Sequence, residues 1–130
     1  MPVAEFISAA NSVPTTVPRA DLVQSAKRIM SVRRARLRLF GGTISREVAW
    51  EMLLILYIRD GGARTTVTRL ANAARTPGTT ALRWIDYLES QRLITRVANP
   101  LDARSVFIEL TEKARSLLDL FLIETRDLPT

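Results

Sequence analysis

The stretch from Thr66 to Leu110 constrains the fold of this chain more than any other. It holds a short helical pattern, a turn, a longer helical pattern and two alternating segments that a second turn joins. In the longer helix, apolar positions recur at i, i+3, i+4 and i+7, which places them on one face. These positions are Ala81, Trp84, Ile85 and Leu88. The order of helix, turn, helix and β-hairpin is that of a winged helix-turn-helix.

The longer helix, expected at about residues 77–90, has a polar face opposite its packed face. Thr76-Pro77 marks its start, since threonine caps helices and proline suits the first helical position. Thr79, Thr80 and Arg83 lie on the outward side. Hydroxyl groups can bond phosphates or base edges and arginine pairs with guanine, so this face suits the major groove of DNA. We predict that it is a recognition helix.

The alternating segments predict a wing at about residues 93–110. Apolar positions alternate along residues 93–97 and again along 106–110, and Asn99-Pro100 begins the turn between them. The tip of this hairpin holds Asp102 and Arg104. An arginine on a hairpin tip can enter a narrow minor groove, where the negative potential is enhanced.

Helical patterns also cover residues 21–40, 45–59, 66–74 and 111–125. We expect Asp21, Thr66 and Thr111 to be N-caps, because their side-chain oxygens accept hydrogen bonds from free amide groups. Gly41-Gly42 should end the first of these helices. In the second of these helices, at 45–59, apolar residues cover most of the circumference, which predicts a central core helix. Residues 64–66 are expected to add one short strand to the hairpin.

The last helix carries more apolar surface than one small core would cover. Its apolar residues are Ala114, Leu117, Leu118, Phe121, Leu122 and Ile123. One side of the first helix collects Leu22, Ala26, Ile29, Leu37 and either Val32 or Arg33. We therefore predict that parts of these two helices form a homodimer seam.

A chain of 130 residues fits one domain. The expected fold is mostly α with a small β-hairpin wing, and its N- and C-terminal helices form the dimer seam. Residues 1–20 are expected to be an N-terminal arm ahead of a single winged-helix domain at 21–130. In that domain, 21–40 and 111–127 are the predicted dimerisation helices and 46–110 the predicted DNA-binding lobe.

Composition excludes several kinds of site. The chain has no cysteine and no histidine, which removes disulfides, thiolate metal sites, and the commonest metal ligand and general base. Glu47 and Glu51 are four residues apart on one helix, and surface acids at that spacing usually form ion pairs with nearby arginines rather than a catalytic site. We predict no enzyme, no cofactor and no metal. Because no apolar run approaches the roughly 20 residues of a membrane span and no signal peptide is evident, we expect a cytoplasmic protein outside the membrane.

The basic balance of the chain comes almost entirely from arginine. Arginine supplies 17 of the 19 basic residues, against 13 acids, for a net charge of +6. Its guanidinium suits bidentate contacts with phosphate and guanine. The segment from Lys27 to Arg38, both included, holds six basic residues and no acid. This run is either a solvated helix face or a surface for phosphate contact or partner docking.

The wing and the start of the last helix read Asp102-Ala103-Arg104-Ser105-Val106-Phe107-Ile108-Glu109-Leu110-Thr111. This segment resembles the D-x-R-x-x-x-V-x-L-T signature of the MarR family of bacterial transcriptional regulators. The family's spacing is also matched upstream, by Leu70-Ala71, Thr76-Pro77-Gly78, Leu88-Glu89 and Leu93-Ile94. The resemblance spans about residues 46–118.

The resemblance implies a dimeric repressor or activator that binds double-stranded DNA. The recognition helix would approach the major groove and Arg104 the minor groove. The expected DNA-binding residues are Thr66, Arg75, Thr76, Gly78, Thr79, Thr80, Arg83, Asp102 and Arg104. The alternative is a winged-helix module that docks an acidic protein without specific DNA binding, because a fold does not fix a function.

Three positions depart from the family pattern by replacing a frequent glycine. They are Arg75 between the two helices, Arg92 after the recognition helix and Ala114 in the last helix. If Arg92 takes a positive φ, the conformation costs about 1 kcal/mol relative to glycine. Phosphate contacts by the arginines would explain the exchange, and a slightly different turn would serve as well.

Members of the resembled family often bind aromatic or phenolic effectors between the dimer helices and the DNA-binding lobe. A small aromatic effector is therefore a further expected partner. Phe40, Trp50 and Met52 would line its pocket, or they are ordinary core residues.

Overall fold

The computed structural model describes residues 17–126. Its helices are α2 (Arg19–Ile44), α3 (Glu47–Arg59), α4 (Val67–Ala73), α5 (Gly78–Ser90) and α6 (Glu112–Arg126). Its strands are β1 (Thr65–Thr66), β2 (Ile94–Ala98) and β3 (Val106–Leu110). The expected fold, mostly α with a winged helix-turn-helix, is confirmed. Most of the predicted N-terminal arm, at 1–20, lies outside the described residues.

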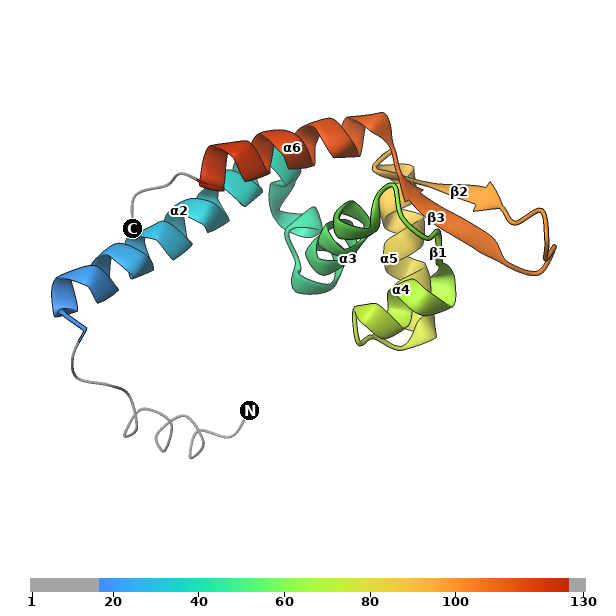
Figure 1. The fold of residues 1–130 in the computed structure, drawn as a ribbon, viewed down its shortest axis with the longest axis horizontal. Helices are drawn as coiled ribbons and strands as arrows, with labels where there is room; N and C mark the ends of the chain where they lie inside the picture. Colours follow the sequence, from blue (N-terminus) through green and yellow to red (C-terminus); the bar gives the residue numbers. More distant parts are fainter. Residues whose placement is uncertain (1–16, 127–130) are drawn as a thin grey trace, which may run out of the picture.

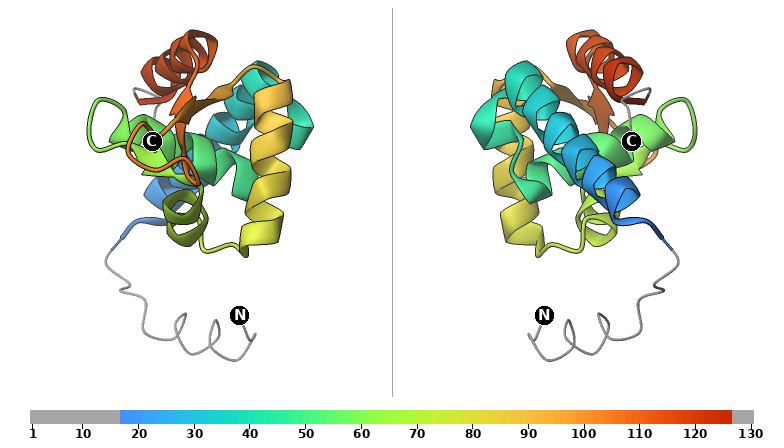
Figure 2. Two further views of the ribbon diagram at one scale, coloured as in Figure 1. Left: turned by 90° about the vertical axis from the view of Figure 1, so that its right-hand side faces the viewer. Right: turned by 90° about the vertical axis from the view of Figure 1, so that its left-hand side faces the viewer.

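The helix-turn-helix and the last helix lie on opposite sides of the molecule. In Figure 1, α6 crosses the top while α4 and the beginning of α5 form the lower edge, and α3 lies between them. The end-on views of Figure 2 show the same separation. The N-terminal part of α2 and the wing project in opposite directions along the longest axis (Figure 1).

The wing supplies two of the three strands of a small antiparallel sheet. The strand order is β1-β3-β2. In β2, Ile94 pairs with Leu110 and Ala98 with Val106 of β3, while Thr65 of β1 pairs with Ile108. The predicted hairpin and the short strand at 64–66 are therefore both confirmed.

Helix α3 is the centre of the hydrophobic core, as its apolar circumference predicts. Ala49, Met52 and Leu53 are completely buried. Trp50 packs edge-to-face against Phe40 of α2 and Phe121 of α6, with ring centroids 5.1 and 4.9 Å apart. These three rings join three helices at one point.

The two helices of the helix-turn-helix end in the same way. After α4, the amide of Arg75 donates to the carbonyl of Asn72 at 3.1 Å and that of Thr76 to the carbonyl of Ala71 at 3.0 Å. After α5, the amide of Arg92 donates to Glu89 at 2.9 Å and that of Leu93 to Leu88 at 3.0 Å. This pair of bonds is the Schellman motif, which requires a left-handed residue that is usually glycine.

Arginine occupies both left-handed positions. Arg75 has φ 52° and Arg92 has φ 60°. The positive φ considered for Arg92 from its sequence position is therefore confirmed, and the same conformation holds at Arg75. A side chain in this region costs energy because Cβ crowds the backbone.

Two of the expected N-caps are confirmed and one is wrong. Thr66 Oγ1 accepts a hydrogen bond from the amide of Arg69, and Thr111 Oγ1 accepts one from Ala114, both at 3.2 Å. Asp21 is not a cap, because the carbonyl of Pro18 already accepts hydrogen bonds from the amides of residues 21 and 22. The helix therefore begins at Arg19.

Thr76 is not the cap of α5 either. Pro77 takes the N-cap position, and its carbonyl accepts the amide of Ala81 at 2.9 Å. The reason is the preceding motif, since the amide of Thr76 is already engaged in closing α4. The recognition helix consequently starts at Gly78, one residue later than expected.

The side of α2 expected to be apolar is not the side that packs within the protomer. Leu22 is 54% exposed and Ile29 70% exposed, whereas Ala35 and Phe40 are buried. Gly41, with φ 78°, breaks the regular helix as predicted. The outer part of α2 therefore carries apolar side chains that no described residue covers.

Replacing Arg92 with glycine should raise the free energy of unfolding by about 0.5–1 kcal/mol, because glycine adopts positive φ without strain. Urea unfolding followed by circular dichroism would measure the change. Gln91→Gly is the matched control, since Gln91 has φ −84° and gains nothing from glycine. An Arg92→Gly variant that loses as much stability as the control would contradict the strain argument.

Candidate nucleic-acid interface

From residue 61 to the middle of α5, every charged side chain is positive, and the acids of α5, Asp86 and Glu89, come only after this segment. Residues 61–85 contain four arginines and no aspartate or glutamate. Arg69, Arg75 and Arg83 are exposed, and none of them forms an ion pair with any residue from 17 to 126. Arg64, Arg96 and Arg115 are by contrast paired with carboxylates. The three unpaired guanidinium groups are therefore available to an anionic partner.

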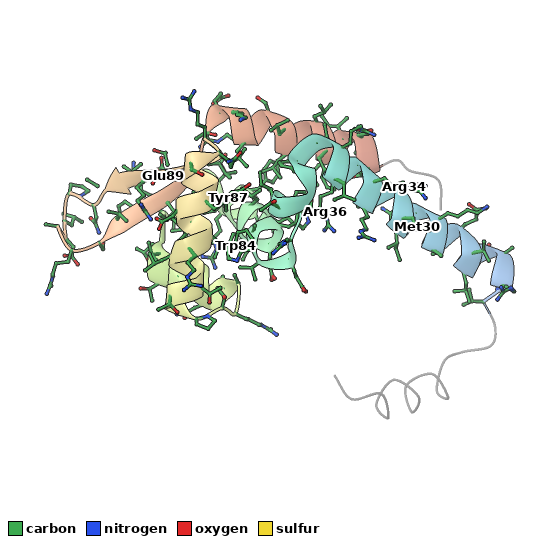
Figure 3. All side chains as sticks on the ribbon, turned by 180° about the vertical axis from the view of Figure 1, so that it is seen from behind. Met30, Arg34, Arg36, Trp84, Tyr87 and Glu89 are labelled. Atoms are coloured by element: carbon green, nitrogen blue, oxygen red, sulfur yellow. The ribbon has the colours of Figure 1, made fainter. Side chains whose placement is uncertain are left out.

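The recognition helix packs as its spacing predicts. Ala81, Ile85 and Leu88 are completely buried. Trp84 and Tyr87 are partly buried and lie on the side of α5 that faces the body of the molecule (Figure 3). Their rings meet edge-to-face at 6.1 Å.

The polar residues predicted on the outer face of α5 divide into two groups. Gly78, Thr79 and Arg83 are exposed, whereas Thr80 is partly buried. Thr66 and Thr76, also predicted to contact DNA, are partly buried and serve the ends of α4. Exposure thus concentrates at Thr79, Arg83 and the turn residue Arg75.

The wing tip presents the predicted Asp102 and Arg104 together. The amide of Arg104 donates to Asp102 Oδ1 at 3.0 Å, and the Arg104 Nε lies 3.5 Å from the same oxygen. The side chain of Arg104 is 94% exposed. Asp102 therefore fixes the backbone from which an exposed arginine extends.

The wing is fastened to the recognition helix by Arg96 of β2. Its Nη2 donates to Asp86 at 2.6 Å and its Nη1 to Glu89 at 3.0 Å. Because both carboxylates lie on α5, the helix and the strand hold one another at a fixed angle. Sequence reasoning missed this contact; the signal available was a pair of acids at i and i+3 on one helix face, followed by a strand arginine.

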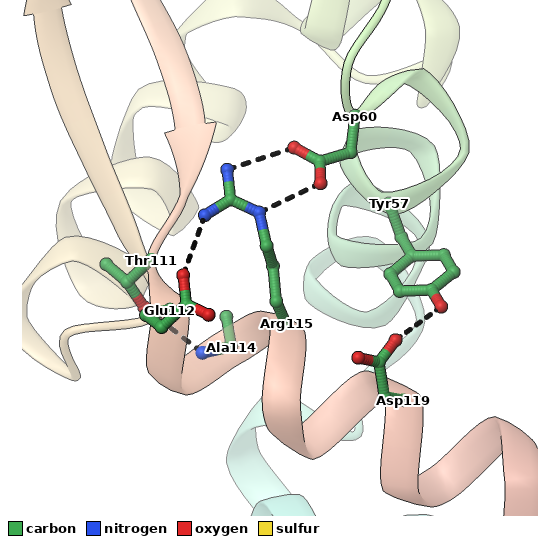
Figure 4. Close-up of polar contacts among 7 residues, drawn as sticks. All are labelled: Tyr57, Asp60, Thr111, Glu112, Ala114, Arg115 and Asp119. Atoms are coloured by element: carbon green, nitrogen blue, oxygen red, sulfur yellow. Dashed lines mark hydrogen bonds and ion pairs between the residues drawn. The ribbon is translucent and has the colours of Figure 1, made fainter.

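A second set of polar contacts joins α6 to the end of α3 (Figure 4). Arg115 donates to both oxygens of Asp60, from Nε at 2.8 Å and from Nη2 at 3.0 Å. This bond lowers the pKa of the Asp60 carboxyl below its ordinary value. Tyr57 donates to Asp119 at 2.6 Å, which raises the pKa of the tyrosine.

Thr111 connects the recognition helix to α6. Its hydroxyl donates to the carbonyl of Arg92 at 2.6 Å and accepts from the amide of Ala114. Its own amide donates to the carbonyl of Leu93 at 3.0 Å. One residue therefore bonds both to the turn that ends α5 and to the first turn of α6.

The residues predicted to line an effector pocket lie together, chiefly as core. Met52 is completely buried, and Phe40 and Trp50 form the aromatic cluster described above. Trp50 also borders a hollow of about 560 Å³, whose other lining residues are Arg36, Ser45, Glu47, Glu51 and Leu54. The Arg36 guanidinium lies 5.3 Å from the Trp50 ring. Phe40 and Met52 do not line this hollow.

Comparison of the whole fold with solved structures finds similar proteins, whereas comparison of the sequence does not. No protein-family model matches the chain, and no curated protein matches its sequence. S. aureus MepR in complex with DNA superposes with a TM-score of 0.66 at 23% identity, over 82% of each chain. The transcriptional regulator PA4135 gives a TM-score of 0.61 at 25% identity, over 88% of this chain and 78% of its own. NadR in complex with 4-hydroxyphenylacetate gives 0.64 at 18% identity, over 89% and 79%.

The crystal structure of a mutant E. coli MarR is similar as well, with a TM-score of 0.61 over 88% of this chain. This chain has the MarR-type winged-helix fold. The resemblance seen in its wing signature is thus confirmed for the fold as a whole. These MarR-type neighbours are regulators rather than enzymes. Among the described residues, no helix combines the length and apolar character that crossing a membrane requires.

The Asp60–Arg115 pair of this MarR-type fold predicts a pH-dependent stability. Because the folded pKa of Asp60 is lowered, its contribution is present above the unfolded pKa of 3.8 and is lost as pH falls through the folded value. Asp60→Asn should cost about 0.5–1 kcal/mol of unfolding free energy at pH 7. The difference from wild type should shrink below pH 3.8.

Urea unfolding at a series of pH values would measure this difference. Glu112→Gln is a suitable control, since Glu112 is 89% exposed and lies 3.6 Å from Arg115. A loss for Asp60→Asn that is the same at pH 3 as at pH 7 would show that the ion pair is not its cause.

Proposed function

We propose that this chain is a DNA-binding transcriptional regulator that acts as a homodimer in the bacterial cytoplasm. The observation that carries the proposal is the acid-free segment 61–85, which exposes Arg69, Arg75 and Arg83 without carboxylate partners among the described residues. Duplex DNA is the partner that suits this surface, because arginines that neutralise phosphates release condensed counterions and gain affinity. Residues 46–110 would form the DNA-binding lobe.

The proposed docking places α5 in the major groove and the wing tip at the minor groove. Thr79 and Arg83 would contact base edges and phosphates, and Arg75 would reach the backbone beside the turn. The hydrogen bonds of Arg96 to Asp86 and Glu89 support this arrangement, since they keep α5 and the wing in a fixed position relative to one another. The MepR neighbour, which was solved with DNA, offers the matching precedent.

The proposed homodimer would use α2 and α6, the predicted dimerisation helices at 21–40 and 111–127. A groove of about 840 Å³ lies between them, and its apolar lining includes Ile29, Val32, Leu122 and Ile123. Ile29 is 70% and Ile123 60% exposed, and Figure 3 shows Met30 and Arg34 on the same outlying part of α2. A second copy of these helices would remove this apolar surface from water.

A small aromatic effector stays a prediction. The support comes from NadR, a structure of the same fold that holds 4-hydroxyphenylacetate. In this chain Trp50 and Arg36 border a hollow and would supply an aromatic face and a cation. The repressor or activator role depends on the operator and stays a prediction as well.

DNA binding should depend on Arg83 and Arg104 in different ways. Fluorescence anisotropy would be measured on a duplex selected from a random library, at several salt concentrations. Arg83→Ala should cost about 1–3 kcal/mol on the selected site and relax the base preference. Arg104→Ala should weaken binding and reduce the slope of log K against log salt by about 1.

Lys113→Ala is the control, because Lys113 is an exposed cation whose ammonium donates to the carbonyl of Gln91, at the opposite end of α5 from Gly78 and Thr79. It should leave affinity nearly unchanged. If wild-type protein bound no duplex at low salt, the proposal would fail. An acidic protein retained on the wild-type chain after nuclease treatment would then favour the interaction module.

Ile29→Glu should convert the homodimer to a monomer without unfolding it, because Ile29 contributes little to the protomer core. Sedimentation velocity at micromolar concentration, together with circular dichroism, would measure both properties. Ile58→Glu is the matched control, since Ile58 is 81% exposed near the end of α3 and does not line the groove. A monomeric wild type, or a dimeric Ile29→Glu, would contradict the proposed seam.

A further inference from the structure

Two side chains of the wing tip extend into solvent, and the D-x-R signature accounts for one of them. Leu101 is 94% exposed, the highest value for a large apolar side chain within residues 17–126. The Arg104 side chain is also 94% exposed. A scattered surface leucine needs no explanation by itself. Leu101, however, occupies the same position in its turn as Arg104 does in the next turn.

Two consecutive turns with one hydrogen-bond pattern build the tip. In the first, the carbonyl of Asn99 accepts the amide of Asp102 at 3.3 Å and Asn99 Oδ1 accepts the amide of Leu101 at 2.9 Å. In the second, the carbonyl of Asp102 accepts the amide of Ser105 at 3.1 Å and Asp102 Oδ1 accepts the amide of Arg104 at 3.0 Å. Asn99 Nδ2 donates to Ser105 Oγ at 2.9 Å and ties the two turns together.

Both turns therefore begin with a residue whose side chain fixes the amide two positions later, as in an Asx turn. Leu101 and Arg104 occupy the third position of their respective turns. The second positions hold Pro100, which favours this place in a turn, and the small Ala103. The tip thus presents one apolar and one cationic side chain on a backbone whose shape is set in advance.

We infer that Leu101 packs against the deoxyribose walls of the minor groove that Arg104 enters. This inference rests on the proposed DNA binding. The two side chains are three residues apart on adjoining turns, so a groove that receives one brings its wall to the other. Sugar C–H surfaces line the minor groove, and apolar side chains are used there by proteins that read its shape.

The Leu101 contact should differ from that of Arg104 in how its contribution to affinity depends on salt concentration. Burial of a leucine removes apolar surface from water and involves no charge. Its contribution to affinity is consequently independent of counterion release. A phosphate or minor-groove contact by arginine is instead coupled to salt.

The test is anisotropy titration of the full chain on a duplex selected from a random library, at four salt concentrations. Leu101→Ala should weaken binding about ten-fold at every salt concentration, with an unchanged slope of log K against log salt. Arg104→Ala should lower the slope by about 1. Leu101→Met, which restores apolar surface, should bind within about two-fold of wild type. Thermal unfolding of each variant would show that the fold is retained.

Ala103→Ser is the matched tip control and should bind like wild type. A duplex with 2,6-diaminopurine in place of adenine at the wing site adds an amino group to the minor groove. This base substitution should lower the affinity of wild type by a larger factor than it lowers the affinity of Leu101→Ala. Suppose that wild type binds the duplex. If Leu101→Ala then binds equally well, or if the affinity that it loses changes with salt concentration, the role of Leu101 is overturned while the proposed function stands. If wild type binds no duplex, the proposed function fails and the role of Leu101 with it.

Discussion

The burial of Trp50 is the interaction on which the arrangement of this molecule depends. Its ring lies between Phe40 of α2 and Phe121 of α6, so the central helix holds both outer helices by one aromatic cluster. Edge-to-face pairs of this kind contribute about 0.5–1.5 kcal/mol beyond the area they bury. Without the cluster, α2 and α6 would lose the contact that orients them against the helix-turn-helix. The long outer part of α2 can extend from the protomer because its inner end is fixed there.

Polar contacts then fix the angles between neighbouring elements, which the aromatic cluster does not determine. Arg96 sets the angle between the wing and α5, and Arg115 with Asp60 sets that between α6 and α3. Each arginine meets two acceptor oxygens, which specifies direction as well as distance. The cations of the helix-turn-helix have no such partners among the described residues. Arg96 and Arg115 are therefore paired where geometry must be held, whereas Arg69, Arg75 and Arg83 are unpaired where a partner is expected.

Much of the fold could be predicted from the sequence, because periodicity and caps act locally. The packed face of α5, the capping roles of Thr66 and Thr111, and the hairpin all follow from patterns a few residues long. The cap of α5 is Pro77 and not Thr76 as the sequence predicts, because closure of α4 takes up the amide of Thr76. The Arg96 and Arg115 contacts join elements that only the fold brings together. Which apolar side of α2 packs inside the protomer was likewise undetermined, since periodicity does not distinguish a core from an interface.

Thr111 has a mechanical consequence for the molecule as a whole. Its hydroxyl bonds the carbonyl of Arg92 and the amide of Ala114, and its amide bonds the carbonyl of Leu93. The turn that ends α5 and the first turn of α6 are therefore joined through a single residue. A rotation of α6 about its axis would be transmitted to the recognition helix as a tilt, with no flexible loop to absorb it. In the proposed homodimer, the angle between the two subunits would thus set the angle at which each α5 approaches DNA.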